Sequence, residues 1–148
     1  MTMTYDEFLN QFGEMTYTFK GVSMRPLLVQ GRDLFTVRRK MPTERCRKYD
    51  VVLYHRGDQY VLHRIIRVLP DGHYVILGDN CINKEYATTD DDIIGIMTSC
   101  IRKGRTISVE SFGYKLYSRC HVFLSPVRIL WRRALGFAKR CVKKLLGR

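Results

Sequence analysis

Long hydrophobic runs are missing from this chain of 148 residues, which contains no window of about 18 apolar residues. We therefore expect no helix that spans a bilayer. Residues 1–8 are acidic and contain no apolar segment, so they do not have the pattern of a signal peptide. These absences predict a cytoplasmic protein without a signal peptide or a transmembrane helix.

A pairing pattern among the cysteines is also missing, because the chain has five cysteines and no Cys-x-x-Cys motif. An odd number of cysteines without metal-ligand spacing indicates neither a disulfide framework nor a zinc site. Reduced thiols are typical of cytosolic proteins. Cys81 is the cysteine that follows a candidate functional motif, the turn Gly78-Asp79-Asn80.

Acidic residues are absent from residues 125–148, although this segment holds eight Lys and Arg residues. The segment contributes +8 to a formal net charge of +12 and leaves only +4 to the other 124 residues. This uneven distribution indicates a tail that binds an anionic surface, and not a protein whose whole body binds nucleic acid.

The same segment has the periodicity of an amphipathic helix of up to 24 residues. Pro126 after Ser125 is a typical helix start, and Gly147 marks the end. Apolar residues recur at steps of three and four, with the basic residues on the other face: Val127, Leu130, Trp131, Ala134, Leu135, Ala138, Cys141, Val142 and Leu145.

A helix with one apolar and one cationic face is typical of peripheral attachment to an anionic membrane surface. The alternative is that this helix packs on its own domain with its basic residues in solvent. No nucleic-acid partner is expected, because the apolar face would have no role in such a complex.

Before this tail, short β-strand patterns alternate with turns rich in Gly and Asp. A short helix capped by Thr4 precedes them. Strands are predicted at residues 15–20, 34–39, 49–55, 60–66, 73–77, 93–97 and 106–109. The pattern predicts a small, mainly β, barrel-like domain in residues 1–113, followed by a basic helical tail in residues 114–148.

The stretch Gly21-Val22-Ser23-Met24-Arg25-Pro26 connects two of these strands. Gly21 can adopt backbone angles that other residues avoid, and Pro26 fixes its own φ and favours extended geometry at the residue before it. These constraints would hold Ser23 at the rim of the sheet, with Met24 packed beneath it. Taken alone, the stretch is better explained as an ordinary turn.

Two later motifs change this interpretation. The strand at residues 60–66 carries His63 followed by Arg64, and the next strand leads into Gly78-Asp79-Asn80. In this order, the three motifs resemble the S24/S26 peptidase superfamily. They are most similar to type I signal peptidases (S26), whose boxes are Gly-x-Ser-Met-x-Pro, a base before Arg, and Gly-Asp-Asn. The resemblance covers about residues 19–104 and implies the coiled, β-barrel-like fold of signal peptidases and SOS-repressor proteases.

The resemblance also implies a reaction. Bacterial signal peptidases usually have Lys as the base, and His63 at this position resembles the archaeal and endoplasmic-reticulum branch, which uses a Ser-His pair. Ser23 is then the nucleophile and His63 the general base, a role that suits histidine near neutral pH. A carboxylate is expected to orient His63, with Asp79 favoured and Glu85 as the alternative.

The Ser23 backbone N–H is the expected donor to the oxyanion. Signal peptidases often carry a second donor, a serine two residues before the nucleophile, but Gly21 occupies that position here. A second departure is Tyr49, which stands where family members have glycine.

Together, these assignments predict a signal-peptidase-like serine endopeptidase that cleaves a leader or precursor peptide, or a preprotein, at a membrane surface bound by residues 125–148. No metal or cofactor is expected. The alternative is a catalytically idle, membrane-associated peptide-binding module of the same fold. A self-cleaving regulator of the SOS-repressor kind is less favoured, because the chain has no Ala-Gly or Cys-Gly pair and only 22 residues before Ser23.

Overall fold

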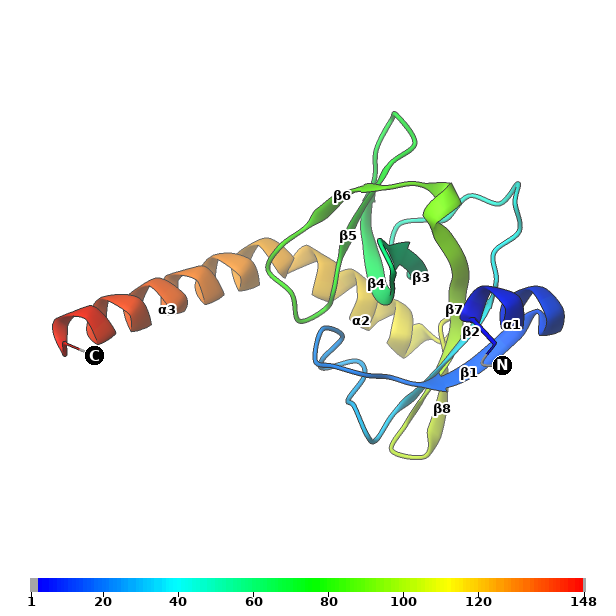
Figure 1. The fold of residues 1–148 in the computed structure, drawn as a ribbon. Coiled ribbons are helices and arrows are strands. Elements are labelled where there is room, and N and C mark those ends of the chain that lie inside the picture. The colour runs from blue at the N-terminus through cyan, green and yellow to red at the C-terminus, as the bar shows by residue number, and fades with distance from the viewer. Residues whose placement is uncertain (1–2, 148) are drawn as a thin grey trace.

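Eight strands form one antiparallel β-sheet in the computed structural model, which describes residues 3–147 (Figure 1). Helix α1 (Tyr5–Phe12) precedes the strands, and α2 (Phe112–Phe123) and α3 (Ser125–Leu145) follow them. The strands are β1 (Glu14–Thr18), β2 (Leu34–Arg39), β3 (Val51–Arg56), β4 (Gln59–Val68), β5 (Tyr74–Leu77), β6 (Glu85–Thr88), β7 (Ile93–Arg102) and β8 (Arg105–Ser108). A 3-10 turn, η1 (Asp90–Asp92), lies between β6 and β7. The prediction of a mainly β fold followed by helix is confirmed.

The sheet order is β1-β2-β7-β3-β4-β5-β6, and β8 pairs with β7. β3 and β4 form the predicted hairpin, in which Val52 lies opposite His63. β4 also pairs with β5, where Arg64 lies opposite Leu77. The His63 motif and the turn Gly78-Asp79-Asn80 are therefore neighbours, because that turn directly follows β5.

Local capping signals explain the first helix. The Thr4 hydroxyl accepts a hydrogen bond from the Glu7 N–H at 3.2 Å, and the Glu7 carboxylate accepts one from the Thr4 N–H at 2.8 Å. This reciprocal pair is a capping box, which satisfies two backbone donors at the start of the helix. Gly13 ends the helix at a φ of 76°, in the left-handed region that glycine adopts readily.

Two clusters of buried side chains stabilise the sheet. The first contains Met24 and Leu28 from the loop between β1 and β2, and both side chains are fully buried. The second gathers residues of β3, β4 and β5, among them Tyr54 and Ile65. Met24 is buried in the core and anchors the chain one residue away from Ser23.

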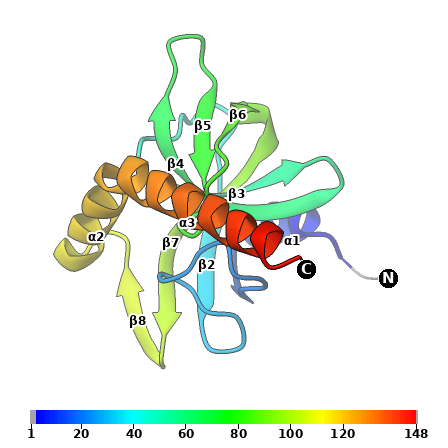
Figure 2. The ribbon, with the colours of Figure 1, turned by 90° about the vertical axis from the view of Figure 1, so that its left-hand side faces the viewer.

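The C-terminal helices contact the body unequally. Tyr114 and Ser118 of α2 are buried, whereas the buried residues of α3 are Ser125 and Ile129, close to its beginning. Beyond them, α3 extends away from the sheet (Figures 1 and 2). Within residues 3–147, no helix has both the length and the hydrophobicity needed to cross a bilayer.

Candidate active site

Ser23 lies in the turn between β1 and β2, half-buried at the surface. Gly21 has a φ of 91°, and its N–H donates to the Gln30 side-chain oxygen at 2.6 Å. The Leu28 N–H donates to the Met24 carbonyl at 3.0 Å and closes the turn on its other side. No described group accepts the Ser23 N–H, so this donor is free to bind a developing oxyanion.

His63 lies in the middle of β4 and is 5% exposed. Its Nδ1 lies 3.3 Å from the Tyr54 hydroxyl oxygen, and that hydroxyl donates to Glu85 Oε2 at 3.0 Å. Because the single Tyr54 proton is directed at Glu85, the His63 Nδ1–H donates to the Tyr54 oxygen. The other ring nitrogen, Nε2, is then unprotonated and can accept a proton.

The protonation states of these groups agree with this arrangement. Burial lowers the pKa of His63 below its ordinary value of 6.5, although the negative charge of Glu85 opposes the shift. Burial, and next the charge of Glu85, raises the pKa of the Tyr54 hydroxyl. At neutral pH the site therefore holds a neutral imidazole and a protonated tyrosine.

Glu85 is the carboxylate close to the His63 ring, with 3.6 Å between Oε1 and Nδ1. It lies at the start of β6 and also accepts a hydrogen bond from Arg56 at 3.1 Å. Asp79 was the favoured prediction for this orienting role, but the structure gives its side chain different partners. Both of its oxygens are bound by the Arg64 guanidinium, at 2.8 and 2.9 Å.

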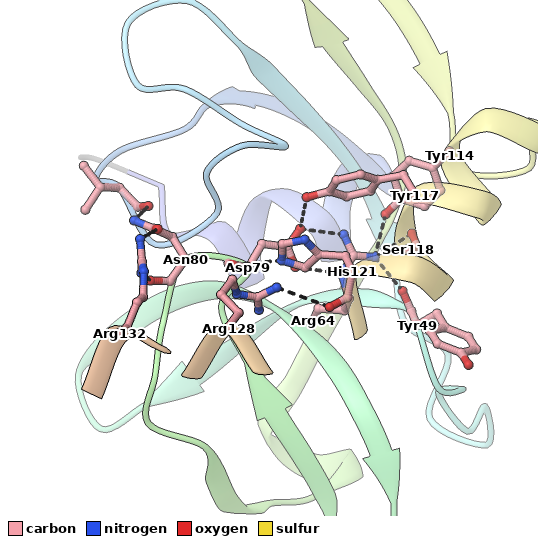
Figure 3. A network of polar contacts seen from close by, with 11 residues as sticks. Tyr49, Arg64, Asp79, Asn80, Tyr114, Tyr117, Ser118, His121, Arg128 and Arg132 are labelled. Atoms are coloured by element: carbon pink, nitrogen blue, oxygen red, sulfur yellow. Dashed lines mark hydrogen bonds and ion pairs between the residues drawn. The ribbon is translucent and has the colours of Figure 1, made fainter. Parts of the chain in front are cut away.

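The Arg64–Asp79 ion pair is the centre of a buried network (Figure 3). Asp79 also accepts a hydrogen bond from Tyr117 of α2 at 2.9 Å. Arg64 donates in addition to Ser118 Oγ at 2.8 Å and to the Tyr49 carbonyl at 3.1 Å. Burial opposes ionisation of Asp79, but the charge and hydrogen bonds of Arg64 outweigh it and lower the pKa of Asp79 below its usual value.

The turn Gly78-Asp79-Asn80 also binds the Ser23 turn directly. The Asn80 N–H donates to the Ser23 carbonyl at 2.7 Å, and its side-chain amide donates to the Val22 carbonyl at 3.0 Å. Gly78 is required by this close approach. A Cβ at this position would lie 2.8 Å from the Ser23 carbonyl oxygen and 2.9 Å from His63 Cδ2, the ring carbon bonded to Nε2.

Ser23 and His63 line the same cavity, of about 540 Å³, together with Cys81 and the aromatic side chains of Tyr5 and Phe19. A second cavity of about 650 Å³ shares His63 and Cys81 with the first and extends to Ile82 and Asn83. Among the described residues, no hydrogen bond joins Ser23 to His63, although such bonds often form only when substrate binds. The structure thus brings the three sequence motifs together around one site.

Two residues of the site were not recognised from the sequence. Tyr54 was read only as part of a strand, although it lies two positions beyond Val52, the residue opposite His63. The hairpin register could have revealed it, because alternate residues of a strand share a face. Arg132 of α3 binds Asn80, a contact between distant segments for which the sequence contains no local signal.

No protein-family model matches the chain, and a search of curated proteins finds no significant match. The interpretation of the site therefore depends on its residues and their geometry.

The buried ion pair generates a prediction about stability. Arg64→Met should lower the free energy of unfolding by about 3–5 kcal/mol, because it leaves the Asp79 carboxylate buried without its partner. Urea unfolding followed by circular dichroism measures the change. Arg67→Met, at an exposed position on the same strand, is the control and should stay within about 0.5 kcal/mol of wild type. Equal destabilisation by both variants would contradict the assignment.

Proposed function

We propose that this protein is a serine endopeptidase similar to type I signal peptidases, with Ser23 as nucleophile and His63 as general base. The observation that carries the proposal is that Ser23 and His63 line one cavity while the Gly78-Asp79-Asn80 turn is hydrogen-bonded to the Ser23 carbonyl, because these three motifs occur in the same order in that superfamily. In this proposal, the antiparallel sheet is the coiled, barrel-like fold of the superfamily.

In the proposed reaction, the Ser23 hydroxyl oxygen attacks the carbonyl carbon of the scissile peptide bond while Nε2 of His63 takes the hydroxyl proton. The resulting imidazolium donates from Nδ1 to Tyr54, and Tyr54 donates to Glu85, so the carboxylate charge stabilises the cation through the tyrosine. The Ser23 N–H binds the oxyanion. His63 then protonates the leaving amine, and water hydrolyses the acyl-enzyme with His63 again acting as the base.

The proposed substrate is a leader or precursor peptide in an extended conformation. Ser23 lines the first of two cavities that share His63 and Cys81, and an extended peptide that occupies both would pass the reacting serine. An extended chain gains affinity from main-chain hydrogen bonds, while side-chain pockets provide selectivity. Phe19 and Leu62 line one cavity, and Ile82 lines the other, so both can accept apolar side chains.

We further propose that α2 and α3 attach the enzyme peripherally to an anionic membrane on the cytoplasmic side. Exposed apolar side chains recur at helical spacing across both helices: Phe112, Leu116, Phe123, Val127, Leu130, Trp131 and Phe137. Trp131 is 65% exposed and Phe123 is 83% exposed. An apolar stripe beside a cationic face matches the two components of an anionic membrane surface, and each Lys or Arg near such a surface contributes about 1 kcal/mol.

A second candidate function is a catalytically idle peptide-binding module on the same membrane. It is favoured by two observations: no described hydrogen bond joins Ser23 to His63, and Gly21 supplies no side-chain donor to the oxyanion. Removal of one oxyanion donor from a serine protease costs about 3–4 kcal/mol in transition-state stabilisation. Activity measurements separate the two functions.

The first functional prediction concerns the Ser-His pair. Purified protein with anionic vesicles should cleave members of a panel of leader-type peptides, and Ser23→Ala and His63→Ala should each lower the rate by about 10³-fold or more. Mass spectrometry of the products gives the rate and the cleavage rule. His73→Ala, in the turn before β5, is the control and should cleave normally. Cleavage that survives Ser23→Ala would exclude Ser23 as the nucleophile.

The second functional prediction concerns Glu85, the candidate third residue of the catalytic group after Ser23 and His63. Glu85→Gln should lower kcat roughly 100-fold, because the imidazolium loses its charge partner. Since burial keeps the pKa of His63 below 6.5, kcat/KM of wild type should rise with pH and reach a plateau near neutrality. The midpoint should move to lower pH in Glu85→Gln, because the charge that raises the pKa of His63 is gone. Asp91→Asn, an exposed carboxylate in η1, should leave kcat and the midpoint unchanged.

The third functional prediction concerns the membrane. Trp131 fluorescence should shift to the blue with vesicles that contain anionic lipid and not with neutral vesicles, because the indole enters the interface. Leu130→Glu should weaken vesicle binding by roughly tenfold or more, since it places a charge in the apolar face. Thr106→Glu on β8 introduces the same charge far from the helix and should bind as wild type does. Equal binding of both variants would contradict the proposed face.

A further inference from the structure

One side chain of α3 joins that helix to the candidate site. The Arg132 guanidinium donates to both the backbone carbonyl and the side-chain oxygen of Asn80 (Figure 3). Arg132 follows the buried Ser125 and Ile129 at helical spacing, so it lies on the face of α3 that is turned toward the body. This two-bond contact is called the Arg132–Asn80 clasp below.

One hydrogen bond connects the clasp to Ser23, the candidate nucleophile. Asn80 uses its two oxygens to accept from Arg132 and its two kinds of N–H to donate to the Ser23 and Val22 carbonyls. A rotation of the Asn80 side chain would break the bond to Val22, and a shift of its backbone would break the bond to Ser23. Because Arg132 holds both oxygens, it restricts both movements.

The C-terminal end of α2 and the start of α3 make further contacts around the Gly78-Asp79-Asn80 turn. His121 Nε2 lies 2.8 Å from the Asp79 carbonyl oxygen, and Arg128 donates to the His121 carbonyl at 3.2 Å. Pro126 and Ile129 of α3 line a cavity with Asn83 and Lys84, the residues that lead to Glu85. The helices therefore contact the segments on either side of Cys81, which carry the partners of both Ser23 and His63.

We propose that Arg132 is a positioning residue for Ser23, which acts through Asn80 and makes catalysis depend on the docked position of α3. This inference rests on the proposed function, because it assigns Arg132 a part in the same reaction. The apolar side chains of α3 lie on the face opposite the clasp, so the helix can bind a membrane without releasing Asn80. The enzyme is then catalytically active when α3 is docked on the β-sheet domain through the clasp.

Four variants test the proposal in the full-length protein. Arg132→Gln should lower kcat about 10-fold with KM within about twofold, because misplacement of a reacting group reduces the rate of the chemical step more than binding. It should lower the rate at which a fluorophosphonate labels Ser23 by the same factor. Arg132→Lys keeps the charge and one donor and should recover part of both rates. Asn80→Ala removes the side-chain half of the clasp and keeps the bond to the backbone carbonyl, so Arg132→Gln should lower kcat by a smaller factor in the Asn80→Ala background than in wild type.

Hydrogen exchange provides a readout that does not require activity. Arg132→Gln should accelerate exchange of the Asn80 amide, whose N–H is bonded to Ser23, while the core strands exchange as in wild type. Arg119→Gln is the matched control: it removes the same charge from α2, where Arg119 has no hydrogen bond or ion pair to another described residue. Equal labelling, kcat and exchange in Arg132→Gln and Arg119→Gln would overturn the proposal.

Failure of the proposed function has a different signature. In that case neither wild type nor any of the variants at position 132 cleaves the peptides or reacts with the fluorophosphonate. The exchange comparison still decides whether the clasp holds the Ser23 turn: faster exchange in Arg132→Gln alone supports the mechanical link, and unchanged exchange rejects it.

Discussion

The buried ion pair between Arg64 and Asp79 is the interaction on which the rest of the site depends. Desolvation makes an isolated buried pair costly, so such a pair stabilises a fold only where the remaining donors and acceptors are also satisfied. Here Arg64 also binds Tyr49 and Ser118, and Asp79 also binds Tyr117. Loss of any one partner would leave a charge or a polar group unsatisfied inside the protein. Because the partners come from β4, the turn after β5 and α2, the network fixes these three segments relative to one another.

The positions of the candidate catalytic groups follow from this constraint. His63 precedes Arg64 on β4, and because successive side chains of a strand point to opposite faces, the burial of Arg64 on one side directs His63 to the other. Asn80 follows Asp79, so the carboxylate that anchors the turn also places the amide that binds Ser23. Two different residues therefore supply the two carboxylates. Asp79 anchors the turn, and Glu85 faces His63, with the Tyr54 hydroxyl between the imidazole and the Glu85 carboxylate.

The secondary structure was predictable where the signal is local. The capping box at Thr4, the β3–β4 hairpin and the amphipathic period of α3 depend on residues close in sequence, and all three are present. β6 was missed because Glu85–Thr88 contains neither alternation nor an apolar run, and it becomes a strand only by pairing with β5. The hydrophobic pattern of α2 is weak, with polar Ser118 among its buried residues, so the sequence does not indicate where this helix begins and ends.

The sequence motifs of the candidate site could be selected from the sequence, but the side-chain contacts between them could not. Ser23, His63 and the Gly78-Asp79-Asn80 turn could be selected because each has a recognisable neighbour in the sequence. The choice between Asp79 and Glu85 could not be made, because it depends on where Arg64 directs its guanidinium. Likewise, the order of residues does not reveal that Arg132 reaches Asn80 across 52 positions.

In the proposed function, α3 has two roles, one on each face. Most of the stability of a helix in a protein comes from packing of its amphipathic face, so the 21 residues of α3 depend on contacts for their order. Near its beginning, Ser125, Ile129 and Arg132 supply them from the body. Farther along, the exposed side chains include Phe137 and Val142, and burial in a membrane interface would supply the missing contacts there. Because helix formation is cooperative, lipid binding at the far end would stabilise the turn that carries Arg132, and in this way membrane attachment would favour the clasped site.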